Sequence, residues 1–99
     1  MKIHNFKELQ VWQKAMELVV FINQLTACFP KEEKYGLISQ IQRAAISIPS
    51  NIAEGCGRVS DKDFQRFISM AMGSSFELET QMLLAFRFNY ISSEQLKDF

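Results

Sequence analysis

Residues Gly36 to Arg58 read GLISQIQRAAISIPSNIAEGCGR, and this stretch decides the fold. Its apolar side chains recur at steps of three and four residues, at Leu37, Ile38, Ile41, Ala44, Ala45, Ile48 and Ile52. That spacing places them on one stripe of an α-helix, with polar residues on the opposite side. No polar residue interrupts the stripe, so we expect neighbouring helices to bury it.

Pro49 lies in the middle of this helical stretch. It has no amide hydrogen, so the carbonyl of Ala45 loses its helical donor, a defect worth ~3 kcal/mol in an ordinary helix. The apolar spacing nevertheless continues across the proline without a change of phase. We therefore predict one kinked helix over about residues 35–55 rather than two helices. Gly55 and Gly57 would close it in the left-handed conformation that glycine adopts readily.

Three further helices are predicted around this one. The apolar spacing indicates helices over about residues 7–27 and 62–88. Short links make consecutive helices antiparallel neighbours. Ser92 with Gln95 has the spacing of a capping box, so a fourth helix should cover about residues 93–99. The predicted fold class is therefore all-α: a single domain that forms an antiparallel up-down-up-down helical bundle, with a short or truncated fourth helix.

The third helix carries small residues in its middle. Its expected buried stripe consists of Phe64, Phe67, Ile68, Ala71, Ser75, Leu78, Met82, Ala85 and Phe86. Gly73 and Ser74 interrupt the helix formers, and a mid-helix glycine costs about 1 kcal/mol relative to alanine. We expect these small residues to let another backbone approach closely, with Ala44 and Ala45 as the partner, rather than to be merely tolerated.

The chain has more apolar surface than one small bundle needs. Every residue from Leu18 to Ile22 is apolar, so the first helix needs cover on more than one side there, from its own bundle or from another chain. The third helix adds Met70, Phe76, Leu83, Leu84 and Phe88 outside its main stripe. Each buried leucine or phenylalanine contributes roughly 1.5–3 kcal/mol. We therefore predict a homo-oligomer.

Composition excludes several classes of protein. The 99 residues include 11 basic and 11 acidic side chains, so the chain has no overall attraction to nucleic acid or to an anionic membrane. Basic residues are scattered, at Lys2, Lys7, Lys14, Arg66 and Arg87, without a run. No apolar run approaches the ~20 residues of a membrane span. Cys28 and Cys56 lack metal or redox spacing, so we expect reduced thiols in a cytoplasmic protein.

Catalytic residues are not predicted. The only histidine, His4, lies in the polar stretch before the first helix, and no metal-ligand spacing accompanies it. Glu77 and Glu79 are two residues apart, so on a helix they point to different sides and do not form an acid–base pair. An ion pair with an arginine of a neighbouring helix or subunit is the better interpretation. We expect a protein that is not an enzyme and that holds no cofactor or metal.

The polar side of the central helix permits two interpretations. Arg43, Ser47, Ser50 and Glu54 follow one another at four- and three-residue steps, and Arg58 follows Glu54 by four. This row could be a solvated face with one weak ion pair worth a few tenths of a kcal/mol. It could equally be a docking stripe or a contact between subunits.

A family resemblance bears on this choice. The segment RAAISIPSNIAEGCGR at 43–58, followed by FQRF at 64–67 and AMGSSFELET at 71–80, resembles the four-helix bundle proteins of the 23S rRNA intervening-sequence family. The likeness extends from Phe6 to about Gln95. It favours the contact interpretation, and the candidate interface residues are Arg43, Pro49, Asn51, Glu54, Gly55, Arg58, Gly73, Ser74, Glu77 and Glu79.

The resemblance also implies an architecture and a role. Family members carry a full fourth helix, from which this sequence departs. The family is similar to the accessory proteins of diversity-generating retroelements, which form pentameric barrels that engage nucleic acid and a reverse transcriptase. By resemblance the chain is a non-enzymatic, pentameric scaffold for RNA or for a protein partner. A basic ring on the oligomer would indicate RNA, a neutral and partly apolar mouth would indicate protein, and a pocket of convergent titratable groups would indicate an enzyme.

Overall fold

The structure is a computed structural model, and it describes residues 5–99. The described chain contains four α-helices, which are α1 (Gln10–Thr26), α2 (Leu37–Cys56), α3 (Asp61–Arg87) and α4 (Ser93–Asp98). Two short 3-10 helices precede α1 and α2, η1 (Phe6–Glu8) and η2 (Lys31–Glu33). No strand occurs between residues 5 and 99. The all-α class is confirmed, and the helix positions agree closely with the predicted ranges.

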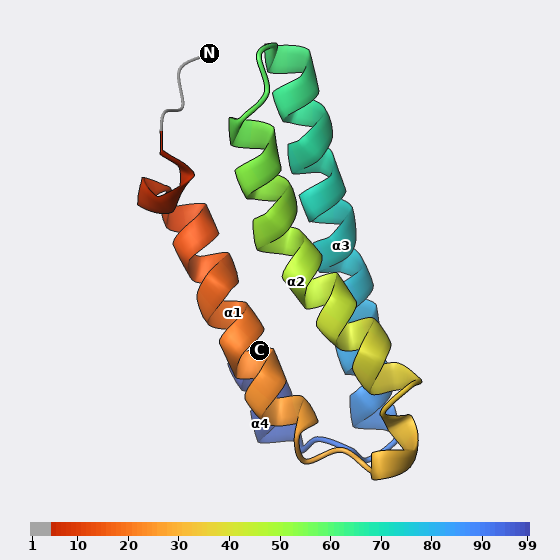
Figure 1. Cartoon of the computed structure of the whole chain (residues 1–99). Coiled ribbons are helices and arrows are strands. Elements are labelled where there is room, and N and C mark those ends of the chain that lie inside the picture. The colour runs from red at the N-terminus through yellow and green to blue at the C-terminus, as the bar shows by residue number, and fades with distance from the viewer. Residues whose placement is uncertain (1–4) are drawn as a thin grey trace.

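The helices lie lengthwise and α2 occupies the centre (Figure 1). Successive helices run in alternating directions, with the link from α1 to α2 at one end of the molecule and the link from α2 to α3 at the other. Both α1 and α3 pack against α2, whereas no Cα atom of α1 comes within 8 Å of one in α3. The short α4 packs against α3. The central helix therefore holds the described part of the chain together.

The core forms along the predicted stripe of α2. Its largest fully buried apolar side chains are Ile22 from α1, Ile41 from α2, and Leu78 and Met82 from α3. In α2 the residues Ile41, Ala44, Ala45, Ile48 and Ile52 are all buried. The prediction for α3 is wrong at two positions, because Ser75 and Phe86 are exposed.

The helix ends follow the predicted caps with one correction. The Ser60 hydroxyl accepts from the Asp63 amide at 3.1 Å, and a complete capping box joins Ser92 and Gln95 at the start of α4. Gly57 is the C-cap of α2, but its φ of −87° is not left-handed, so that part of the prediction is wrong. Between residues 5 and 99, only Asn89 has a left-handed φ, at 65°.

Glu33, in the link before α2, forms two hydrogen bonds to other parts of the chain. One carboxylate oxygen of Glu33 accepts from the Leu37 amide at 3.2 Å, at the start of α2. The other accepts from the Tyr90 hydroxyl at 2.7 Å, in the turn between α3 and α4. This hydrogen bond, with burial and the negative charge of Glu33, raises the pKa of Tyr90. Glu33 therefore ties both connections at this end of the molecule together.

None of the helices formed by residues 5–99 is long and apolar enough to cross a lipid bilayer.

Candidate interaction site

Two side chains next to Pro49 are hydrogen-bonded to the backbone of α2 one turn earlier. The helix continues through the buried Pro49 without a break, as predicted. The Ser50 hydroxyl donates to the carbonyl of Ile46 at 2.8 Å, and the Asn51 side-chain amide donates to the carbonyl of Ser47 at 2.8 Å. Side-chain bonds of this kind, to a carbonyl one turn back, are typical of bent helices. Two residues of the motif, Pro49 and Asn51, thus belong to the central helix itself, one buried in it and one hydrogen-bonded to its backbone.

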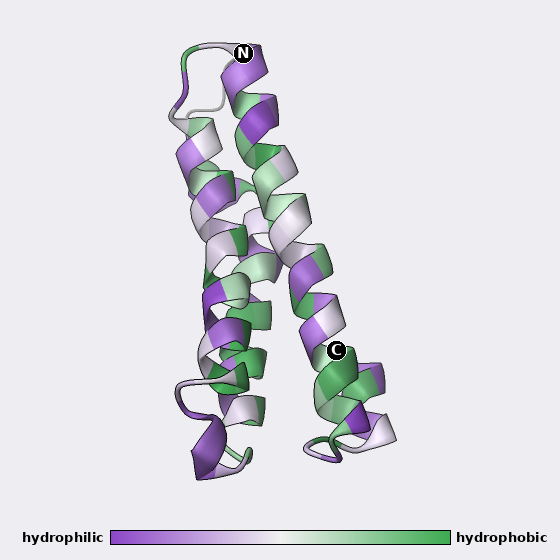
Figure 2. Cartoon of the chain, turned by 90° about the vertical axis from the view of Figure 1, so that its right-hand side faces the viewer, coloured by the Kyte–Doolittle hydropathy of each residue, from purple (hydrophilic) through white to green (hydrophobic). Residues whose placement is uncertain are grey.

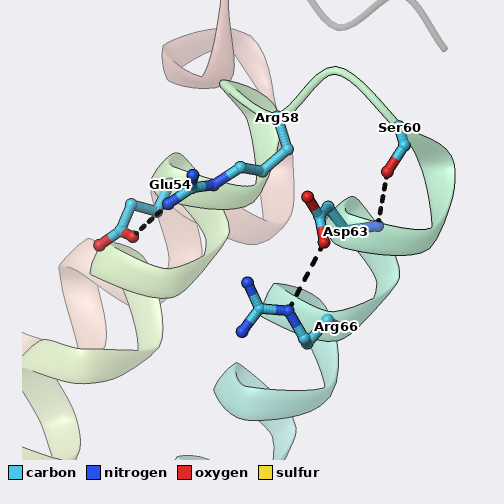
Figure 3. Close-up of polar contacts among 5 residues, drawn as sticks. All are labelled: Glu54, Arg58, Ser60, Asp63 and Arg66. Carbon is cyan, nitrogen blue, oxygen red and sulfur yellow. Dashed lines mark hydrogen bonds and ion pairs between the residues drawn. The ribbon is translucent and has the colours of Figure 1, made fainter.

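Charged side chains from the end of α2 and from the first turns of α3 lie close to one another (Figure 3). Glu54 and Arg58 form an ion pair at 3.0 Å, and Arg66 approaches Asp63 at 3.6 Å. The guanidinium of Arg58 lies 4.4 Å from the centroid of the Phe67 ring, and that of Arg66 lies 4.7 Å from it. Each arginine thus has a carboxylate and a ring face within its own chain. Neither depends on a phosphate or on another subunit for a partner.

Gly55 permits the close approach of α2 and α3. A Cβ atom at this position would lie 3.0 Å from the Cβ of Phe67 and 3.4 Å from the carbonyl oxygen of Phe64. The opposite holds at Gly73, where a Cβ would meet no atom within 4 Å. The predicted close approach at Gly73 is therefore wrong, because this residue lies on the exposed side of α3. The neighbouring Ser74 faces α2 instead, and its hydroxyl is hydrogen-bonded to that of Ser47.

Arg43 and Glu77, unlike Arg58 and Arg66, have no charged partner among the described residues. Both line an open pocket of about 570 Å³ between α2 and α3, together with Tyr35, Gln40 and Ser47. Neither side chain has a hydrogen bond or an ion pair to any residue from 5 to 99. The predicted pairing of Glu77 or Glu79 with an arginine does not occur among residues 5–99. It stays a prediction for a contact between subunits.

The outward side of α3 is rich in apolar side chains. Seven of them are at least 38% exposed: Met70, Met72, Phe76, Leu83, Leu84, Phe86 and Phe88. Phe76 is 62% exposed and Phe88 is 50% exposed. Figure 2 shows that hydrophobic residues are distributed along α3 among hydrophilic ones rather than in a single band. In α1, Val20 is 57% exposed, so the apolar segment from Leu18 to Ile22 is not fully covered by its own chain.

Groups suited to chemistry are sparse between residues 5 and 99. No set of three histidine, cysteine, aspartate or glutamate side chains is placed to hold a metal ion in this part of the chain. Cys28 is exposed and Cys56 is half-buried, and both are free thiols. Burial raises the pKa of the Cys56 thiol, which makes it less reactive. His4 lies outside the described residues.

Fold and surface together define an all-α helical-bundle protein with several exposed apolar side chains on its third helix. The family model of the 23S rRNA-intervening sequence protein matches residues 7–99, so the chain belongs to that family. This confirms the resemblance found in the segments around Pro49 and Gly73. A comparison with curated protein sequences finds no match.

Proposed function

We propose that this chain is a non-catalytic subunit of a homo-oligomer that serves as a scaffold. The observation that supports it most is the apolar outward side of α3, where Phe76 and Phe88 are at least half exposed. Association with further copies would bury these side chains, at roughly 1.5–3 kcal/mol for each leucine or phenylalanine. The number of subunits, five, rests on the family resemblance alone.

Light scattering on purified protein at micromolar concentration tests the oligomer. We expect a mass of several chains for the unchanged protein and a shift toward the monomer for Phe76→Asp. A matched control is Val59→Asp, because Val59 is 97% exposed in the link between α2 and α3. A single-chain mass for the unchanged protein would refute the proposal. Turnover of a substrate that disappears on mutation of one polar residue would refute the non-catalytic part.

An RNA partner is the second candidate, and the charges of this chain predict how such binding would depend on salt. The chain has no net charge, and Arg58 and Arg66 each have a carboxylate partner already. Binding to phosphates would therefore be weak and would fade steeply with salt, because it depends on counterion release. Retention of labelled RNA at about 50 and 200 mM salt measures this. Tight, sequence-selective binding that ignores salt would contradict it, and no retention at low salt would favour a protein partner.

A further inference from the structure

Tyr35 is a large aromatic residue that lies on the surface and not in the core of this chain. It directly precedes Gly36, the N-cap of α2, and it is 89% exposed. The Lys34 ammonium lies 5.4 Å from the centroid of its ring. Its hydroxyl has no hydrogen-bond partner among residues 5–99. Tyrosine is among the residues that most often anchor protein interfaces, where its ring is buried and its hydroxyl is bonded.

A pocket of complementary chemistry lies between α3 and α4. Its volume is about 280 Å³, and it is lined by Leu83, Leu96, Phe99 and Glu79. Three of these residues are apolar and the fourth is a carboxylate. Glu79 makes no hydrogen bond or ion pair with the described residues. Such a pocket suits a group that has an apolar body and one hydrogen-bond donor. A lysine or arginine would satisfy Glu79 but would place its charge against the apolar walls.

We propose that these two features meet between copies of the chain. Tyr35 of one subunit places its ring against Leu83 and Leu96 of the next, and its hydroxyl donates a hydrogen bond to Glu79. This inference rests on the proposed homo-oligomer and names the contact that builds it. A phenol donor and a carboxylate acceptor form a charge-assisted hydrogen bond, which is stronger than a neutral one.

The placement of the two features fits a ring. They lie on different parts of the surface, so the contact is head-to-tail, and a head-to-tail contact closes into a ring when its rotation allows. The start of α2 and the whole of α4 lie at the same end of the molecule (Figure 1). Anchor and pocket are therefore at similar levels along the helices, as a ring with its axis parallel to them requires. Leu83, which is 49% exposed in the single chain, would become covered.

Substitution of the anchor is the first test. Sedimentation velocity over a dilution series gives the concentration at which the assembly dissociates. We expect Tyr35→Ala to raise that concentration about thirtyfold or more, as at interface hot spots. Tyr35→Phe keeps the ring and loses only the hydrogen bond to a charged acceptor, so we expect it to raise the dissociation concentration roughly tenfold. The control is Val59→Ala, which changes an exposed residue at the opposite end and should leave the value unchanged. Circular dichroism checks that each variant is folded.

Mixing two variants tests the head-to-tail geometry. Tyr35→Ala keeps an intact pocket, and Leu83→Glu keeps an intact tyrosine. At a concentration where each alone is monomeric, we expect their mixture to form a one-to-one heterodimer and nothing larger, because only one contact can be made per pair. An unchanged dissociation of Tyr35→Ala, or no heterodimer, would overturn this contact while the oligomer stands. A monomeric unchanged protein would overturn the proposed function as well.

Discussion

The two helical glycines Gly55 and Gly73 allow packing to be separated from helix propensity. Alanine at a helix interior is favoured over glycine by about 1 kcal/mol, and at Gly73 nothing opposes this gain. At Gly55 the new Cβ would lie 3.0 Å from the Cβ of Phe67 and 3.4 Å from the Phe64 carbonyl oxygen. Neither atom can rotate away, because both are fixed to the backbone of α3. Overpacking of this kind costs about 1–3 kcal/mol.

We therefore expect Gly73→Ala to be more stable than the unchanged protein by about 1 kcal/mol. We expect Gly55→Ala to be about 1–3 kcal/mol less stable than Gly73→Ala. Gly55 is one residue from the end of α2, where the propensity gain is smaller, and this widens the gap. For a chain of this size the midpoints of thermal unfolding should differ by roughly 5–20 °C.

Thermal unfolding followed by circular dichroism measures both variants. The samples must have the same protein concentration, because association makes the midpoint depend on it. Equal midpoints for the two variants would refute the reasoning, since the close approach of α2 and α3 at Gly55 would then carry no energetic weight. A Gly55→Ala variant more stable than Gly73→Ala would refute it more strongly.

Two further substitutions follow from the helix ends. Ser60→Ala removes the N-cap of α3 and should destabilise the chain by about 1 kcal/mol in urea unfolding, whereas Ser69→Ala, an exposed serine within the same helix, should not. The Tyr90 hydroxyl donates a hydrogen bond to Glu33, which raises the pKa of Tyr90 above the usual value near 10. The contribution of this hydrogen bond to stability is therefore complete below pH 10 and is lost as the pH rises through the raised pKa. Tyr90→Phe should lack this alkaline component of the loss of stability, and an identical pH dependence in the two proteins would count against the assignment.

Most of the fold could be predicted because it depends on local spacing. The apolar stripe of α2 predicted its buried residues, and the Ser92–Gln95 spacing predicted a capping box that is present. The bond from Tyr90 to Glu33 joins residues 57 positions apart, and no local pattern indicates it. In a sequence, a glycine that caps a helix cannot be distinguished from one that lets a neighbouring helix approach closely. Only the position of α3 shows that Gly55 does the second.

In the candidate site, too, local contacts could be predicted from the sequence and contacts that depend on helix packing could not. Glu54 and Arg58 at the end of α2 are four residues apart, and so are Ser47 and Asn51 within it, so both bonds could be expected from spacing. The exposed position of Gly73 could not, because it depends on the rotation of α3 against α2. Tyr35 was not singled out in the sequence, where it stands at the start of the helix predicted over about residues 35–55. Its exposure, and the pocket beside Glu79, become visible only when the helices are in place.

The central claim is that copies of the chain cover the apolar outward side of α3. Native mass spectrometry of the purified protein, sprayed from micromolar solution, counts the chains in each assembly directly. Our account predicts one dominant homo-oligomer, with five chains if the family resemblance extends to the subunit number. A dimer or tetramer would show that number to be wrong and leave the argument from exposed residues intact. A spectrum of single chains alone would contradict the account.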